Sequence, residues 1–335
     1  MIQIFNSAND ILQEIDCDIS RAIDVAHKWI HLTNPTDKEI ELISRLTAIP
    51  EDMLKAALDE EERARLEIDD GVKLVLFDIP TIEDESSYFS YSTMPFGAML
   101  SNNCIVTVCL KESSIIHSLI YGNQKLQTTN RLRMLYQMMY STHISFLHCL
   151  RQIDKASGRI QSELQRTTRN EELIQLLDLE NSLVYFSTSL KANKMVIERL
   201  TRLKTKGEDE EDRELLEDVA IENNQAIDMC NNYRDIMSGT RDAYASVISN
   251  NLNMIMKVLT SLTVVLSIPT LIASFWGMNT TVPFENQLWG FYAVLAIALA
   301  STIIGGVWMS KNQIKIQAKR QVHHPKKPRS KHRKK

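Results

Sequence analysis

The 335-residue sequence lacks the motifs that bind nucleotides or carry common hydrolytic chemistry. It contains neither Gly-x-x-x-x-Gly-Lys-Ser/Thr nor Gly-x-Gly-x-x-Gly, the loops whose glycines let backbone N–H groups approach phosphates. His-Glu-x-x-His, which holds zinc, and Gly-x-Ser-x-Gly, which presents a nucleophilic serine, are also missing. We therefore expect no enzyme, no catalytic residues and no organic cofactor.

Cysteine is also scarce. The five cysteines are an odd number and include no Cys-x-x-Cys pair: Cys17, Cys104, Cys109, Cys149 and Cys230. This usage excludes a disulfide framework and a zinc ribbon, and it fits a reducing compartment. The N-terminal sequence is polar and acidic, unlike a signal peptide, so we expect most of the chain in the cytosol.

Charge is absent from two long stretches near the C-terminus. Val258–Phe284 and Asn286–Ser310 contain no Asp, Glu, Lys, Arg or His, and only Glu285 separates them. A helix of about 20 residues is about 30 Å long, which matches the hydrocarbon core of a bilayer. The pattern predicts transmembrane helices at 258–278 and 287–310, joined by an external loop at 279–286. Because Lys257 and Lys311 flank the pair, the positive-inside rule places both termini in the cytosol, at the cytoplasmic (inner or plasma) membrane.

Acidic residues are missing from the last segment. Residues 311–335 hold eleven Lys and Arg, whereas residues 1–310 hold 42 acidic and 27 basic residues, so the net charges are +11 and −15. We expect an acidic cytosolic body and a basic cytosolic tail that contacts anionic lipid headgroups. Nucleic acid is not an expected partner.

Proline is missing between Pro95 and Pro269, which favours long helices. We expect a helical hairpin at 126–206 and a stalk helix at 207–257 that continues into the first span. Residues 1–125 mix strand-like runs with helical patterns and predict a cytosolic α/β domain. The strand-like runs are Trp29–Leu32, Val72–Ile79 and Cys104–Leu110. Thr36 or Asp37, with Glu39 at or near the third helical position, is the expected helix cap.

Small polar residues recur at spacings of three, four and seven along the first span and lie on one face of a helix. They are Asn253, Thr260, Thr263, Ser267, Thr270 and Ser274. Such a stripe can serve close helix packing, or it can line a pore built from several copies, because two helices alone cannot enclose a water path. Met256 and Leu259 lie beside the stripe, where an apolar ring could gate a pore by dewetting.

The tripeptide Gly277-Met278-Asn279 follows the first span directly. In this position it resembles the signature of the CorA-type divalent-cation transporters. The likeness extends to Met256–Thr260, Pro269–Ala273 and Trp29–Leu32, and so covers the chain up to the basic tail. The resemblance implies a homopentameric magnesium channel: a funnel with an α/β cytosolic domain, a long helical stalk and a two-helix transmembrane hairpin.

The resemblance also implies roles for individual residues. Asn279 would form an outer ring that receives the hydrated ion, Gly277 and Met278 would shape that turn, and Glu285 would attract cations. Asp218 would bind regulatory Mg²⁺, with Asp84 or a neighbouring acid, Glu83 or Glu85, opposite it. Ser267 departs from the bulkier apolar residue that is frequent in the family, which leaves the position of the gate open. The expected pore-lining residues are Asn253, Met256, Leu259, Thr260, Thr263, Ser267 and Thr270.

The expected function is Mg²⁺ uptake, driven by the membrane potential and gated by intracellular Mg²⁺. A zinc or cobalt/nickel transporter on the same fold is one alternative, and uptake measurements separate the two. A non-conducting membrane sensor or scaffold is the other, and Asn279 together with the polar stripe argues against it.

Overall fold

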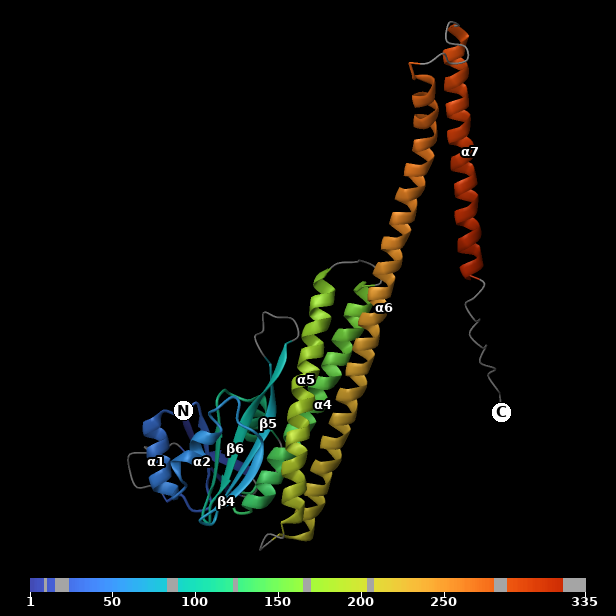
Figure 1. Ribbon diagram of the computed structural model, residues 1–335. Coiled ribbons are helices and arrows are strands. Elements are labelled where there is room, and N and C mark those ends of the chain that lie inside the picture. The colour runs from blue at the N-terminus through green and yellow to red at the C-terminus, as the bar shows by residue number, and fades with distance from the viewer. Residues whose placement is uncertain are drawn as a thin grey trace, which may run out of the picture. The chain divides into compact units, whose positions relative to one another are not determined.

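The computed structural model describes residues 1–8, 11–15, 24–82, 90–122, 126–164, 170–203, 208–279 and 288–321. The chain divides into two compact units, Met1–Asp242 and Ala243–Lys335 (Figure 1).

The described part of the first unit contains one seven-stranded sheet with the order β2-β1-β3-β7-β6-β5-β4. The β3–β7 pair is parallel and the other neighbouring pairs are antiparallel. The predicted strands at 29–32, 72–79 and 104–110 are confirmed as β3, β5 and β7. The strands are β1 (Ile2–Ala8), β2 (Ile11–Glu14), β3 (Trp29–Thr33), β4 (Arg65–Asp69), β5 (Val72–Ile82), β6 (Tyr91–Leu100) and β7 (Ile105–Cys109).

Both faces of the sheet are covered, which explains why its central strands are apolar at almost every position. In β5, Val75 and Phe77 point into one hydrophobic core, whereas Leu74 and Leu76 point into the other. Helices α1 (Asp37–Thr47) and α2 (Glu51–Ala56) cover the Leu74 side. Of the two candidate caps, Thr36 is confirmed and Asp37 is the first residue of the helix. The Thr36 side chain accepts from Glu39 N, and the Glu39 carboxylate accepts from Thr36 N at 2.7 Å.

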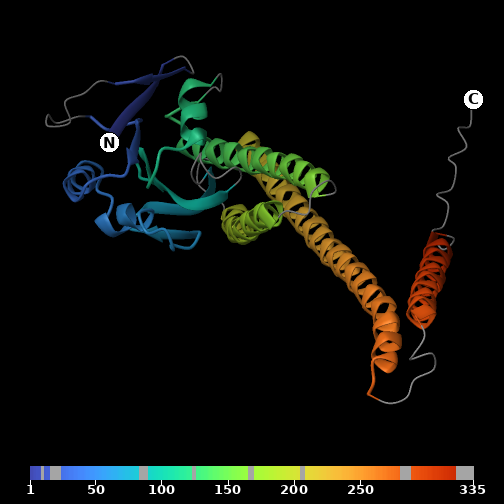
Figure 2. The same cartoon turned by 90° about the horizontal axis from the view of Figure 1, so that it is seen from above.

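The Phe77 side is covered by α3 (Ser114–Tyr121), α4 (Arg131–Leu164), α5 (Asn170–Arg202) and the first part of α6 (Glu210–Trp276). Figure 2 shows α4 and α5 on the side of the sheet opposite α1 and α2. Polar contacts join the long helices. Gln161 of α4 donates to Thr240 of α6 at 3.1 Å, and Cys230 of α6 donates to the Leu183 carbonyl of α5 at 3.0 Å.

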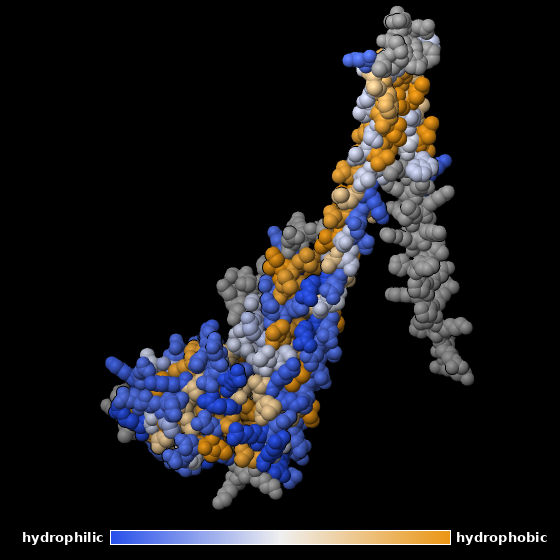
Figure 3. All heavy atoms as spheres, viewed as in Figure 1, coloured by the Kyte–Doolittle hydropathy of each residue, from blue (hydrophilic) through white to orange (hydrophobic). Residues whose placement is uncertain are grey.

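The expected long helices are therefore confirmed, and α6 is a single helix of 67 residues, about 100 Å long at 1.5 Å per residue. In the second unit, the rest of α6 is joined by α7 (Leu288–Gln321). Two helices in the described residues are long and apolar enough to cross a membrane, Glu210–Trp276 and Trp289–Trp308. Figure 3 shows apolar side chains on the surface of both.

Candidate pore-lining face of α6

The membrane segment of α6 has two different faces, and α7 covers only one of them. A Cβ built on Gly305 of α7 would lie 3.7 Å from Ile268 Cδ1 and 3.9 Å from Val265 Cγ2, so the helices approach closely there. The partly buried residues of this segment recur every three or four positions, which is the spacing of one helical face. They are Ser261, Val265, Pro269, Ile272 and Trp276.

The polar stripe predicted from spacing lies on the opposite side of α6. At about 100° per residue, Thr263, Ser267 and Thr270 lie within about 40° of the direction opposite Val265. All three side chains are exposed in the single chain, as is Thr260. The structure thus brings these four predicted residues together on a face that α7 leaves open.

Each hydroxyl of this face donates its proton within the helix. Thr260 donates to the Met256 carbonyl at 2.7 Å, and Thr263 donates to the Leu259 carbonyl at 2.9 Å. Ser267 and Thr270 donate in the same way, to Val264 and Leu266. A hydroxyl has one proton and two lone pairs, so each of these oxygens still has room to accept a hydrogen bond. The open face therefore presents acceptors.

Asn253, Met256 and Leu259 extend this face toward the N-terminal end of the segment. Met256 and Leu259 are 52% and 56% exposed, which is unusual for large apolar side chains on an α-helix unless lipid or another chain covers them. Leu259 lies one turn before Thr263 and Met256 lies two turns before it, so the apolar and hydroxyl positions follow each other along one helix face.

Gly277, Met278 and Asn279 come directly after the end of α6. The Gly277 N–H donates to the Ala273 carbonyl at 2.9 Å and closes the last turn of the helix. A Cβ on Gly277 would lie 3.2 Å from the same carbonyl oxygen, a tight contact that favours glycine at this position. Met278 and Asn279 are both exposed, so the amide of Asn279 is accessible at the end of the span.

Of the remaining predicted residues, Asp218 alone lies among the residues that the structure describes. Asp218 is exposed on the part of α6 that belongs to the first unit. Asp84, its expected partner, and Glu285 both lie outside the described residues. No cluster of three or more His, Cys, Asp or Glu that could hold a metal occurs among the described residues of this single chain.

The described cysteines of the first unit are unreactive thiols. Cys104, Cys109, Cys149 and Cys230 are free and buried, and burial raises the pKa of each thiol, to about 11 or 12. They are therefore protonated at neutral pH and are poor nucleophiles and metal ligands. Cys17 lies outside the described residues.

Sequence reasoning missed the covered face of α6, because no single residue in 258–278 reveals which side the second helix takes. The signal was present in α7, where Gly305 and Gly306 allow a close approach between helices. Only the structure shows that Gly305, and not Gly306, lies against α6 in this chain.

Comparisons with known proteins agree with these observations. A family profile described as "CorA-like Mg2+ transporter protein" matches residues 24–311. The chain is similar to the cobalt/magnesium transport protein CorA of Methanocaldococcus jannaschii, with 29% identity over 290 residues, 82% of this chain and 87% of the relative. It is also similar to the protein of the same name from Thermotoga maritima, with 22% identity over 85% of this chain and 82% of the relative.

A solved structure shows the same fold. The complete structure of the CorA magnesium transporter from Methanocaldococcus jannaschii superposes with a TM-score of 0.78 and 26% sequence identity. The match covers 92% of this chain and 96% of the other, so it includes the α/β region, the long helices and the C-terminal apolar helices.

Proposed function

This chain belongs to the CorA-like Mg²⁺ transporter family, and we propose that it carries Mg²⁺ across a membrane through a pore made by the open face of α6 in several copies. This membership makes it a transporter rather than an enzyme. The observation that carries the proposal is the division of α6 into a face that packs on α7 and an opposite face of hydroxyl groups. One hairpin cannot enclose water, so the pore requires a homo-oligomer, and the family resemblance favours five subunits.

The chemistry of the open face suits hydrated Mg²⁺. This ion prefers octahedral oxygen coordination and loses its water reluctantly. Water bound to a cation turns its hydrogens outward, so the pore wall must accept hydrogen bonds. The hydroxyls of Thr260, Thr263 and Thr270 use their protons within the helix and offer oxygen lone pairs instead. A ring of such oxygens can hold the water shell without removing it.

Other residues complete the proposed path. Asn279 offers an amide oxygen at the outer end, on a turn that Gly277 and Met278 shape, and Glu285 adds a negative charge to the outer loop. Asn253 lies on the same face at the inner end, and rings of Met256 and Leu259 would close the pore by dewetting.

No ATP is required, because a divalent ion gains about 4.6 kcal/mol per 100 mV of inside-negative potential. This direction requires both termini on the cytosolic side, as the flanking lysines predict.

We further propose that internal Mg²⁺ closes the pore by binding between Asp218 of one subunit and Asp84 of its neighbour. The net charge of −15 on residues 1–310 would separate the subunits when the ion leaves. Charge-reversed Asp84→Lys and Asp218→Lys variants should keep conducting at internal Mg²⁺ concentrations that inhibit the wild type. Normal inhibition of both variants would contradict this assignment.

Mg²⁺ influx into dye-loaded liposomes tests the role of the hydroxyls. Thr263→Val keeps the shape of the side chain but removes the acceptor, and we expect influx to fall roughly tenfold, or about 1.4 kcal/mol in the barrier. Thr263→Ser should retain most of the influx. The matched control is Thr302→Val, since Thr302 of α7 makes the same helix-internal bond, to the Ala298 carbonyl at 2.8 Å. Equal influx through Thr263→Val and Thr302→Val would argue against a pore-lining role.

A further inference from the structure

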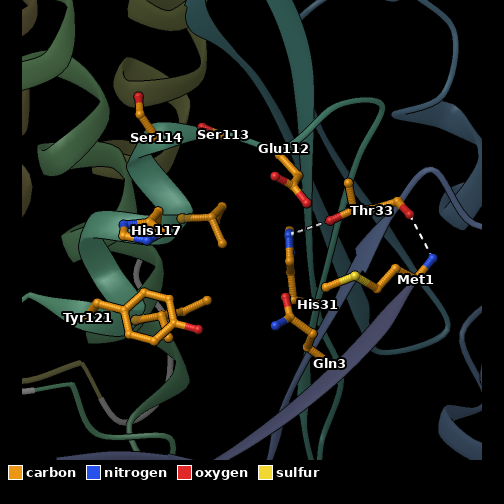
Figure 4. A pocket seen from close by; sticks show the side chains of 11 residues that line it. Met1, Gln3, His31, Thr33, Glu112, Ser113, Ser114, His117 and Tyr121 are labelled. Carbon is orange, nitrogen blue, oxygen red and sulfur yellow. Dashed lines mark hydrogen bonds between the residues drawn. The ribbon is translucent and has the colours of Figure 1, made fainter.

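The first unit contains a cavity of about 450 Å³ between β1, β3 and α3. This volume lies within the usual range for small-molecule sites. Gln3 and His31 come from the strands, Glu112 precedes α3, and Tyr121 ends α3 (Figure 4). Figure 4 shows the Glu112 carboxylate and the Tyr121 ring extending from the α3 side toward His31 and Thr33. Nothing in the proposed transport path uses these residues.

One wall of the cavity is aromatic and apolar. The rings of His117 and Tyr121 are 4.6 Å apart between centroids, and Ile116 lies in the same wall. Tyr121 is 66% exposed, although a large aromatic side chain is usually covered. The two rings are inclined by 45° to each other, and the wall offers an exposed aromatic face on which the body of a ligand can pack.

Among the groups that line the cavity, Glu112 and Gln3 offer hydrogen-bond acceptors, whereas Ser113, Ser114 and His117 can also donate. Gln3 donates its Nε2 to Glu14 Oε1 at 3.1 Å, which leaves its carbonyl oxygen to accept. Among the described residues, no Lys or Arg lines the cavity and no basic side chain pairs with Glu112. The amino group of Met1 is already bonded to the Thr33 carbonyl at 2.9 Å and lies 3.6 Å from Glu39. The Met1 ammonium is thus paired with Glu39, whereas the Glu112 carboxylate has no basic partner among the described residues, so the cavity favours a cation over an anion.

His31 adds neither a positive charge nor a free ring nitrogen to the cavity. Its Nδ1 lies 2.8 Å from Thr107 Oγ1 and its Nε2 lies 3.1 Å from Thr33 Oγ1, so both ring nitrogens are occupied. Burial lowers the pKa of His31 to about 4, so the ring is neutral at physiological pH. Both ring nitrogens are engaged, and among the described residues no three His, Cys, Asp or Glu side chains are placed to hold a metal ion, so a metal ion is disfavoured.

We propose that this cavity binds a small organic cation, in which an ammonium, amidinium or guanidinium group pairs with Glu112 and an apolar body packs on Tyr121. A cationic group forms a charge-assisted hydrogen bond with a carboxylate, which is stronger than a bond between neutral groups. A cation is also attracted to the face of an aromatic ring when the ring lies close to it. Both groups are present in this cavity.

Benzamidinium and benzoate test the proposal, because they share a flat shape and differ in the sign of their charge. We expect the purified full-length chain in detergent to bind benzamidinium saturably and to bind benzoate at least tenfold more weakly. Glu112→Gln and Tyr121→Ala should each weaken benzamidinium binding about tenfold. Glu60→Gln, which removes an exposed carboxylate outside the cavity, should leave binding unchanged.

Several results would overturn the proposal. Absence of saturable benzamidinium binding, equal binding of benzoate, or an unchanged affinity in Glu112→Gln would each do so. Displacement of benzamidinium by Mg²⁺ alone at this site would identify it as a metal site instead. Because the readout is binding and not ion flux, its outcome is independent of whether the chain transports Mg²⁺.

Discussion

Two buried histidines in the first unit are held neutral by their surroundings. His31 lies in a chain of bonds that begins with Trp29 Nε1, which donates to Thr107 Oγ1 at 2.8 Å. His143 of α4 is fully buried, and its Nδ1 lies 2.6 Å from the Met139 carbonyl. Burial is the main cause that lowers the pKa of both rings from 6.5 to about 4. Protonation of either ring therefore opposes folding.

This pair predicts that the first unit loses stability in mild acid. The folded pKa values lie below the unfolded value of 6.5, so the unfolded chain binds more protons between pH 6.5 and 4. Lowering the pH from 7.5 to 5 should cost about 2 kcal/mol for each histidine. Asp78 acts in the opposite sense, because burial raises its pKa, and offsets part of this loss.

Chemical unfolding of the full chain in detergent at several pH values measures this effect. His31→Gln should flatten the dependence on pH between 6.5 and 4, and an exposed-site control, His148→Gln, should not. The same slope in wild type and His31→Gln would contradict the assignment of His31.

Local residue patterns were readable from the sequence, and distant pairs were not. The sequence placed the cap of α1 at Thr36 or Asp37, with Glu39 close by, and the structure selects Thr36, three positions before Glu39. Asn193 of α5 is different, because its amide accepts from Asp78 N at 2.8 Å and donates to the Asp78 carbonyl at 2.9 Å. It caps the free edge of β5 beyond Leu76, where pairing with β4 ends. No local pattern connects residues 115 positions apart.

At the scale of elements, absence of proline was the most informative signal. It predicted α4, α5 and α6, in which apolar residues recur at helical spacing. The strand β6 was missed because Pro95 and Gly97 interrupt it, and both residues are unfavourable in strand interiors. β6 tolerates them because it lies between β5 and β7 and is buried along most of its length. The stripe on α6 was predicted because it needs only the period of a helix.

The contact between α6 and α7 leads to a prediction for two adjacent glycines. Gly305 faces Ile268 and Val265, whereas a Cβ on Gly306 would have no atom within 4 Å. Gly305→Ala should be tolerated, since its methyl group would make ordinary contacts. Gly305→Leu should force the helices apart and lower the thermal stability of the detergent-solubilised protein by several degrees.

Gly306→Leu is the matched control, with the same added volume one residue away. If Gly306→Leu were as destabilising as Gly305→Leu, the packing face of α7 would be assigned wrongly. The open face of α6 would then lose its main support, since it is defined as the face opposite this contact.

For the whole molecule, the average composition conceals three different parts. The net charge of −4 combines an acidic body, two charge-free spans and a basic tail. Membership of the CorA-like Mg²⁺ transporter family explains the first two parts, since the profile covers residues 24–311 and ends where the tail begins. The tail beyond residue 321 lies outside the described residues, so its contact with anionic lipid stays a prediction.

The central claim is that the chain conducts Mg²⁺ and that the ion passes Asn279. The most direct measurement is potential-driven Mg²⁺ influx into liposomes that contain purified wild type or Asn279→Ala, each loaded with a magnesium dye. We predict influx through the wild type that grows with inside-negative potential, and at least a tenfold loss in Asn279→Ala. No influx through the wild type, or equal influx through both proteins, would contradict the account.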